Sequence, residues 1–363
     1  MTTKKDIESA LMRGADTLRD TIDAANYKDY VLPVMFVKYL SDSYTDAVEE
    51  LSKQYSGIRL ERQKKYLPFM VAEGCLFYDL YQQRFADNIG QLMNAAMRQI
   101  EADNNQQLAG VLSAVDYNSE NALGTREHKN AILRDLLEDF EPLDLRPSAI
   151  EVKEGQVPAD VIGDAYEYMI GQFASMAGKK AGSFYTPAAV SEIMARIVDV
   201  QPGERVYDPT CGSGSLLIKA AKKQNSKEVS IYGQEVNGSS VAMAKMNMYI
   251  HEIRDAKIGW GDTLANPVFL DADGNLLLFD AIVANMPFSK DKWASGFNPG
   301  GESSGKGKKE FKMEASLDKF HRFDWGVPPA SKGDWAFLLH MIASLSVNGR
   351  IAAVAPFCVP WRG

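Results

Sequence analysis

The sequence has few cysteines and histidines. Its three cysteines, Cys75, Cys211 and Cys358, lie far apart in 363 residues, and its four histidines are scattered. This pattern contains neither a disulfide framework nor the paired spacing of a zinc site, and it offers no cluster of metal ligands. We therefore expect no metal, and a chain that works in a reducing compartment, the cytoplasm.

Long apolar runs and an excess of positive charge are also missing. No apolar run reaches the ~18–20 residues that a membrane span needs, and the first residues are polar and charged, unlike a secretory signal. We expect no membrane partner. The net charge is −8 and the isoelectric point is about 5.2. Because proteins that grip nucleic acid unaided are more often basic, any such partner would have to be reached with the help of another subunit.

The first part of the chain shows helical periodicity. The length of 363 residues suggests about two domains, and hydrophobic residues make up 45% of the sequence, enough for substantial cores. Residues 4–54 are typical of two long helices, because Ile7, Leu11, Ala15 and Leu18 recur at helical spacing. Further helices are expected through residue 150, including 89–102 and 127–140. The sequence therefore predicts an all-α domain over 1–150, followed by a polar, proline-punctuated join over 142–158.

The second part alternates between helix and strand. Strands are expected near 204–208, 229–234, 257–260, 279–284 and 350–355. This alternation predicts an α/β domain over 151–363 with a doubly wound, mostly parallel sheet. Ligands of such sheets bind beyond the carboxyl ends of the strands, near the point where the strand order reverses.

A glycine-containing loop follows the first predicted strand. It runs from Asp208 through Gly212 and Gly214 to Ser215, where a helix is expected to begin. Both glycines can take positive φ and let a ligand approach the backbone. The third glycine of the dinucleotide fingerprint is missing, because Leu217 stands in its place. A strand-to-helix turn that binds nothing is the alternative.

Acidic residues follow the next two predicted strands. Glu235 closes the second strand, and Asp262 comes directly after the third. A carboxylate in the first position suits the hydroxyls of a ribose, and one in the second could accept a hydrogen bond from the amine of an adenine ring. A solvated strand-end acid and an ordinary turn aspartate are the alternatives.

A second motif ends the fourth predicted strand, with the residues Asn285, Met286, Pro287 and Phe288. An exocyclic amine becomes nucleophilic when acceptors hold its hydrogens, and the Asn285 side chain and the Met286 carbonyl can supply two. Pro287 fixes its own φ and biases Met286 towards an extended conformation. Phe288 offers a face on which a flipped-out base can stack. A chance match is the alternative.

The two motifs together resemble those of N6-adenine DNA methyltransferases. The segment 182–187 resembles the cofactor-contacting loop that precedes the first motif in that family, and 163–168 resembles a family helix. Residues 27–42 resemble the helical start of type I modification subunits. Nearly the whole chain is therefore similar to the modification (HsdM) subunit of type I restriction–modification systems.

This resemblance implies a Rossmann-like sheet and methyl transfer from S-adenosylmethionine to adenine N6 in DNA. It also implies a specificity (S) subunit and, in the full complex, a restriction (R) subunit as partners. The residues expected around the cofactor are Tyr185, Thr186, Pro187, Asp208, Gly212, Gly214, Ser215, Glu235 and Asp262. Those expected at the target base are Asn285, Met286, Pro287 and Phe288.

The sequence departs from the family pattern in two places. The family usually has proline where Met286 stands, although methionine keeps the required carbonyl. The chain ends at Gly363, soon after the last predicted strand, and we expect a catalytic sheet that lacks its C-terminal part. Methylation of a glutamine side-chain amide, methylation of cytosine N4, and an incomplete subunit that only binds cofactor or partners stay open as alternatives.

Overall fold

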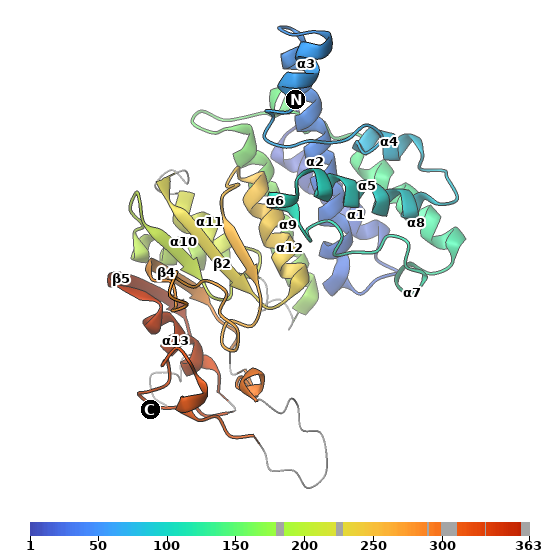
Figure 1. Ribbon diagram of the computed structural model, residues 1–363. Coiled ribbons are helices and arrows are strands. Elements are labelled where there is room, and N and C mark those ends of the chain that lie inside the picture. Colours follow the sequence, from blue (N-terminus) through green and yellow to red (C-terminus); the bar gives the residue numbers. More distant parts are fainter. Residues whose placement is uncertain (179–184, 223–227, 289, 299–310, 331, 357–363) are drawn as a thin grey trace. The chain divides into compact units, whose positions relative to one another are not determined.

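The computed structural model describes residues 1–178, 185–222, 228–288, 290–298, 311–330 and 332–356 (Figure 1). The chain forms two compact units. The first comprises Met1–Ala181 and Lys245–Arg254, and the second comprises Gly182–Ala244 and Asp255–Gly363. Among the described residues, no helix has both the length and the apolar character needed to cross a membrane.

The first unit is helical, as the sequence predicts. A capping box opens α1 (Lys4–Thr17): the Thr3 hydroxyl accepts from the Asp6 N–H at 3.2 Å, and the Asp6 carboxylate accepts from the Thr3 N–H at 2.8 Å. The buried face of α1 packs against α8 and α9. The other elements of this unit are α2 (Tyr27–Ser52), α3 (Gly57–Lys64), α4 (Phe77–Gln82), α5 (Ile89–Asp103), α6 (Asn105–Leu108), α7 (Glu120–Leu123), α8 (Arg126–Phe140), α9 (Pro158–Ala177), and the short helices η1 (Ala24–Asn26) and η2 (Pro147–Ala149).

A buried ion pair lies in the middle of α2. The Lys38 ammonium donates to both carboxylate oxygens of Asp42, at 2.9 and 2.8 Å, and to the Tyr78 hydroxyl at 3.0 Å. Asp42 also accepts from the Leu145 N–H at 2.7 Å. Both charges are therefore compensated, which a charge so far from water requires.

The end of α12 (Gly238–Ile250) belongs to the first unit together with α9. His251 follows α12, and its ring packs against Gly163 of α9 so closely that a Cβ there would lie 2.1 Å from the ring carbon Cε1. Compactness thus groups α9 and residues 245–254 with the helical unit. The division into domains at 150/151 stays a prediction.

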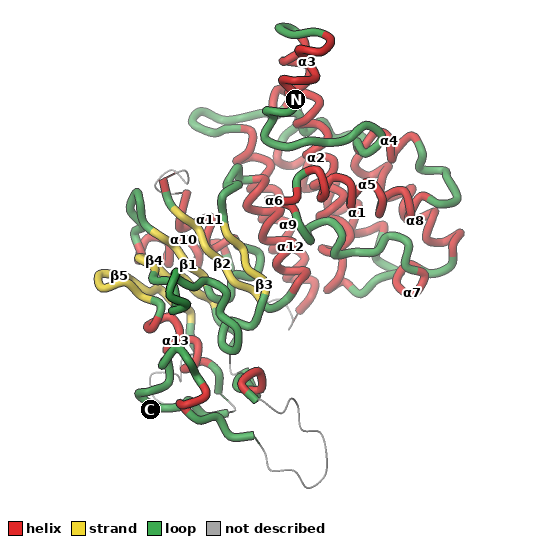
Figure 2. The backbone as a smooth tube through the Cα atoms, viewed as in Figure 1, coloured by secondary structure: helices red, strands yellow, loops and turns green. Residues whose placement is uncertain are grey.

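The second unit contains a sheet of five parallel strands in the order β3-β2-β1-β4-β5 (Figure 2). Its strands are β1 (Arg205–Asp208), β2 (Ser230–Glu235), β3 (Lys257–Trp260), β4 (Phe279–Asn285) and β5 (Leu345–Val354). Helix α10 (Ala188–Val198) packs on β4 and β5, and α11 (Ser215–Lys222) packs on β1, β2 and β4. The parallel sheet expected from the sequence is confirmed. The strand order reverses between β1 and β4, so a ligand site is expected at their carboxyl ends.

The last strand begins earlier than predicted. We expected it at 350–355, but β5 starts at Leu345. Asn348 and Gly349 interrupt the apolar pattern inside the strand. Both residue types are depleted in strands, so the pattern indicated a strand only after them. A register irregularity between Phe279 and Ala281 accommodates this stretch against β4.

An aromatic core packs against the sheet. Tyr207 of β1 stacks on Phe279 of β4, with ring centroids 4.3 Å apart. The segments 290–298 and 311–330, which follow β4 in the chain, contribute the fully buried Trp293 and Phe323. Helix α13 (Asp334–Ala343) adds Phe337 and further residues to the same core. These segments are thereby fixed close to the motif that ends β4.

Candidate active site at the carboxyl ends of the strands

A cavity of about 350 Å³ opens beyond the ends of the strands of the second unit. This volume is within the range of small-molecule sites, about 300–1,000 Å³. The residues that line it come from the ends of four neighbouring strands, from the segment after β4 and from α13: Pro209, Thr210, Glu235, Val236, Asn237, Asp262, Thr263, Asn285, Pro287, Lys290 and Phe337.

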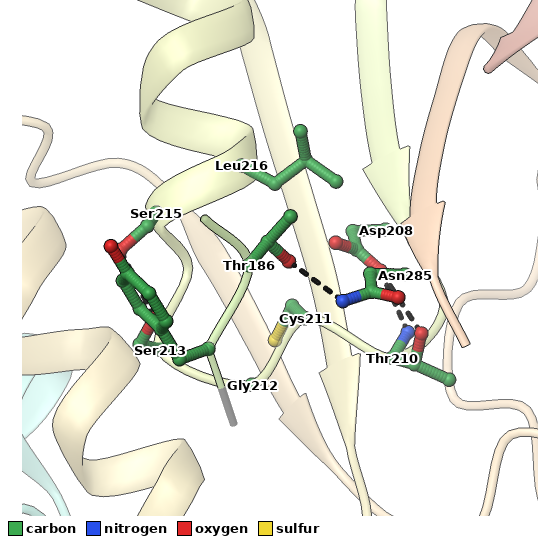
Figure 3. A pocket seen from close by; sticks show the side chains of 10 residues that line it. Thr186, Asp208, Thr210, Cys211, Gly212, Ser213, Ser215, Leu216 and Asn285 are labelled. Carbon is green, nitrogen blue, oxygen red and sulfur yellow. Dashed lines mark hydrogen bonds between the residues drawn. The ribbon is translucent and has the colours of Figure 1, made fainter. Parts of the chain in front are cut away.

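The loop after β1 forms one wall of the site. The buried Asp208 carboxylate accepts from the Thr210 N–H at 2.8 Å (Figure 3). Gly212 and Gly214 have φ of 51° and 76°, the left-handed region that glycine occupies without strain. Ser215 begins α11 directly afterwards. The loop therefore bends sharply while its backbone stays close to the strand end.

Two buried carboxyl groups face this loop. Burial raises the pKa of Asp208 to about 8, with a further contribution from the nearby Glu235 charge. Burial also raises the pKa of Glu235, against the opposing effect of backbone N–H groups and Lys290. Two such groups are costly to ionise together, and a positively charged ligand would favour their ionised forms.

Glu235 supports the loop as well as the cavity. One of its carboxylate oxygens accepts from the Gly212 N–H at 3.0 Å, and the other accepts from the Asn237 N–H at 2.8 Å. A carboxylate has room for further donors on both oxygens. Glu235 therefore joins the ends of β1 and β2 and still presents its carboxylate to the cavity.

Asp262 closes the turn that follows β3. One of its oxygens accepts from the Leu264 N–H at 2.9 Å and from the Ala265 N–H at 3.3 Å. The other oxygen lies 3.7 Å from the Lys290 ammonium. The turn aspartate considered from the sequence is thus present, and the same carboxylate lies on the cavity wall.

The side chain of Asn285 lies between two pockets. Its amide nitrogen donates to the Thr186 hydroxyl at 3.2 Å (Figure 3). Asn285 lines both the cavity and a smaller pocket, which it shares with Tyr185, Thr186, Asp208 and the glycine loop. Because the amide nitrogen is engaged, the amide oxygen remains as the acceptor for a ligand.

Comparisons with known proteins agree with this geometry. The model of the family described as N-6 DNA Methylase matches residues 157–363, more than half of the chain. The chain belongs to the N-6 DNA methylase family. The model described as HsdM N-terminal domain matches residues 7–140. The resemblance drawn from the two motifs is therefore confirmed, and with it the S-adenosylmethionine-dependent methyltransferase class of this second unit.

Relatives of this N-6 DNA methylase are named as methylase subunits of type I restriction enzymes. The chain is 29% identical to the type I restriction enzyme MpnII methylase subunit of Mycoplasma pneumoniae, over 98% of this chain and 67% of that protein. It is 29% identical to the MjaVIII methylase subunit of Methanocaldococcus jannaschii, over 90% of this chain and 53% of that protein. The chain thus spans between about half and two thirds of the length of these two relatives.

A solved structure is similar over almost the whole chain. The type I restriction-modification system methyltransferase subunit from Streptococcus thermophilus has a TM-score of 0.77 and 30% identity, and the match covers 99% of this chain and 76% of that one. The helical unit and the parallel sheet of this N-6 DNA methylase therefore both have counterparts in a single known architecture.

The structure brings most of the predicted site residues of this N-6 DNA methylase together. Tyr185, Thr186, Asp208, Gly212, Ser215, Glu235, Asp262, Asn285 and Pro287 line one pocket or the other. Four lie apart from both linings: Pro187 precedes α10, Gly214 lies in the loop, Met286 is buried, and the Phe288 ring is half exposed. What each residue binds stays a prediction.

Seven residues outside the predicted site set also line the cavity: Pro209, Thr210, Val236, Asn237, Thr263, Lys290 and Phe337. The first five follow strand ends, so the parallel topology could have indicated them. Phe337 lies on α13, and no local pattern connects it with the motifs. Its place follows only from the packing of α13 on the core.

Proposed function

We propose that this chain transfers a methyl group from S-adenosylmethionine to N6 of an adenine in DNA, as the modification subunit of a type I restriction–modification system. The observation that carries this proposal is the position of Asn285. Its side chain lies between the cavity and the smaller pocket, with the amide nitrogen engaged by Thr186 and the oxygen left to accept.

The residues around the cavity fit S-adenosylmethionine. When bound, this molecule supplies an electrophilic methyl group on a positively charged sulfur. We assign Glu235 to the ribose hydroxyls and Asp262 to the adenine amine. The other predicted cofactor residues are assigned to the rest of the S-adenosylmethionine molecule: Tyr185, Thr186, Pro187, Asp208, Gly212, Gly214 and Ser215. The buried Asp208 carboxyl favours a cationic ligand, because a nearby positive charge stabilises its ionised form.

The motif at the end of β4 would prepare the target amine. The Asn285 oxygen and the Met286 carbonyl accept from the two amine hydrogens, which draws the nitrogen lone pair out of the ring. Such acceptors are effective because they are fixed before the charge develops. Thr186 keeps the Asn285 amide in the required orientation. The half-exposed Phe288 ring offers a stacking face for an extruded base.

Partners are part of the proposal. The relatives are named as methylase subunits of type I restriction enzymes. We infer that this chain acts with a DNA-reading specificity subunit, and with a restriction subunit in the full complex. The net charge of −8 supports delivery to DNA by another subunit. A DNA substrate and the lack of a disulfide framework support a cytoplasmic location.

The deciding experiment compares Asn285→Ala and Asn285→Asp in the complex with the specificity subunit. We expect Asn285→Ala to lower kcat by at least ~100-fold, as the loss of a transition-state contact does elsewhere, without weakening S-adenosylmethionine binding. Asn285→Asp keeps the acceptor oxygens and should retain part of the turnover. Full turnover by Asn285→Ala would refute the assigned role.

Product analysis separates the alternatives. N6-methyladenine in the DNA supports the proposal. N4-methylcytosine, or methylated glutamine in a protein, would replace the assigned substrate. Binding of S-adenosylmethionine with no turnover by the wild-type complex would identify a subunit that only binds its cofactor.

A further inference from the structure

The second unit contains a buried arginine whose hydrogen-bonding capacity is fully used. Arg322 lies in the segment 311–330, with 4% of its surface exposed. Its Nε donates to Asp318, as does one hydrogen of Nη2 at 2.8 Å. The other Nη2 hydrogen goes to the Leu264 carbonyl at 2.6 Å, and Nη1 donates to the Thr263 carbonyl at 3.2 Å and to His340 at 3.1 Å. All five N–H groups thus have acceptors.

The two carbonyls held by Arg322 belong to the residues directly after Asp262. Asp262 folds its carboxylate over the same turn, where it accepts from the Leu264 and Ala265 N–H groups. The turn is therefore fixed from both sides: Asp262 holds its N–H groups, and Arg322 holds its carbonyls. A planar guanidinium fixes two neighbouring carbonyls in direction as well as in distance, which an ammonium does not do.

A second path leads from Arg322 to the loop after β1. Burial, followed by the Arg322 charge, holds the pKa of His340 well below its usual range, so its ring is neutral. His340 accepts from Arg322 at Nδ1, so Nε2 carries the hydrogen that faces the Tyr207 hydroxyl at 3.2 Å. Tyr207 is the residue of β1 directly before Asp208, where the loop begins.

Thr263 completes the connection between the two walls of the cavity. Its hydroxyl donates to the Pro209 carbonyl at 2.5 Å. Pro209, Asp262 and Thr263 all line the cavity, whereas Asp318 and Arg322 do not. The buried network therefore lies behind the cavity wall and ends on groups that face the ligand.

We propose that Arg322, clamped by Asp318, is a positioning residue that sets the Asp262 turn for recognition of the cofactor's adenine amine. This inference rests on the proposed function, because it takes the ligand to be S-adenosylmethionine and Asp262 to accept from its amine. Arg322 touches no ligand itself. It acts by holding the carbonyls of Thr263 and Leu264, and so the direction of the Asp262 carboxylate.

The test is calorimetric binding of two ligands by the full chain: S-adenosylhomocysteine, and its inosine counterpart, in which oxygen replaces the adenine amine. We expect the wild type to prefer the amine by roughly tenfold, the effect of one good hydrogen bond to a charged group. Arg322→Lys keeps the positive charge but loses the planar guanidinium that holds the two carbonyls. It should lose most of this preference by weakening the amine ligand selectively.

A double variant identifies the route of the effect. Because Arg322 acts through Asp262, Arg322→Lys should add nothing to the loss caused by Asp262→Ala. Additive losses would show that Arg322 contributes by another path and would overturn the inference. If Arg322→Lys does not fold, as judged by circular dichroism, Asp318→Asn takes its place, since it loosens the same clamp and nearly preserves volume.

Arg350→Lys is the matched control. Arg350 also donates to two backbone carbonyls, those of Val198 and Asp199, and to the carboxylate of Glu204, but it lines neither pocket. Its replacement should leave the ligand preference intact.

Equal weakening of the binding of both ligands by Arg322→Lys, or an unchanged preference, would overturn the inference. A wild-type chain that binds neither ligand would overturn the proposed function, and one that binds both equally would overturn the inference alone.

Discussion

The side-chain amide of Asn285 donates to the hydroxyl of Thr186, a residue 99 positions earlier in the chain, at 3.2 Å. Thr186 precedes α10, and Asn285 ends β4. The bond decides which end of the amide faces the cavity. Thr186 was expected from the sequence to contact the cofactor, and the structure adds this contact with the predicted catalytic residue.

Removal of the Thr186 hydroxyl should lower turnover. Thr186→Val keeps the shape of the side chain but leaves the Asn285 amide nitrogen without its acceptor, so the amide can rotate. We expect kcat for methylation to fall by about tenfold, the effect of one ordinary hydrogen bond. Thr186→Ser retains the hydroxyl and should keep most of the activity. Full turnover by Thr186→Val together with a loss in Thr186→Ser would show that the methyl group matters, and not the hydrogen bond.

Binding of a cationic cofactor should release a proton from Asp208. With its pKa raised to about 8, this carboxyl is mostly protonated at pH 7. A positive ligand lowers its pKa, so affinity should rise with pH up to about 8 and level off above it. Calorimetry at pH 7 in buffers of different ionisation enthalpy should show release of about one proton per ligand.

Asp208→Asn is the control, because it is nearly isosteric and cannot titrate. It should bind S-adenosylmethionine more weakly and without this proton release. The folding stability of the unliganded chain changes with pH in the opposite direction to the ligand affinity. A carboxyl whose folded-state pKa is raised contributes its stability below the unfolded-state pKa and loses it as the pH rises through about 8. Proton release that persists in Asp208→Asn would assign the titration to another group, with Glu235 the nearest candidate.

Substitution of Gly163 should destabilise the helical unit. A Cβ at this position would lie 2.1 Å from Cε1 of the His251 ring, and that side chain is fully buried. We expect Gly163→Ala to lower the free energy of unfolding by about 3 kcal/mol, the upper range for an overpacked core. In a His251→Ala background the same change should have a much smaller effect, because the ring is gone. Urea denaturation of the four proteins measures the difference, and an equal effect in both backgrounds would contradict the assigned clash.

Loss of Lys38 alone should be more harmful than loss of the Lys38–Asp42 pair. Lys38→Met leaves a buried carboxylate without its cation, which costs about 3–5 kcal/mol. Lys38→Met combined with Asp42→Asn should recover much of this, since asparagine can still accept from the Leu145 N–H. Burial raises the pKa of Asp42, so protonation of its carboxyl should relieve the single variant at low pH. A destabilisation that is the same at pH 5 and pH 8 would exclude this explanation.

Local pattern was enough to find the strand ends and the groups that follow them. Asp208, Glu235, Asp262 and Asn285 could be predicted to meet, because the carboxyl ends of parallel strands share one edge of a sheet. The start of β5 was missed because Asn348 and Gly349 hide it. The strand ends could be predicted because the alternation of helices and strands, and with it the parallel topology, is visible in the sequence.

The supporting contacts depend on tertiary packing and could not be predicted. Arg322 and His340 come from segments that carry no motif, yet Arg322 fixes the turn after β3 and His340 accepts a hydrogen bond from Arg322. The bond from Gly212 to Glu235 is of the same kind: the sequence indicated a ribose ligand, and the structure adds a support for the loop. Such contacts join residues that are far apart in the sequence, so they are determined by the tertiary fold and not by a local pattern.

The bond between Glu235 and the Gly212 N–H also has a kinetic meaning. The loop takes its bent shape when the two strands pair, so its conformational entropy is lost during folding and not at each encounter with a ligand. Cofactor association should then be a single step whose observed rate rises linearly with concentration, without the plateau that a slow loop rearrangement would impose.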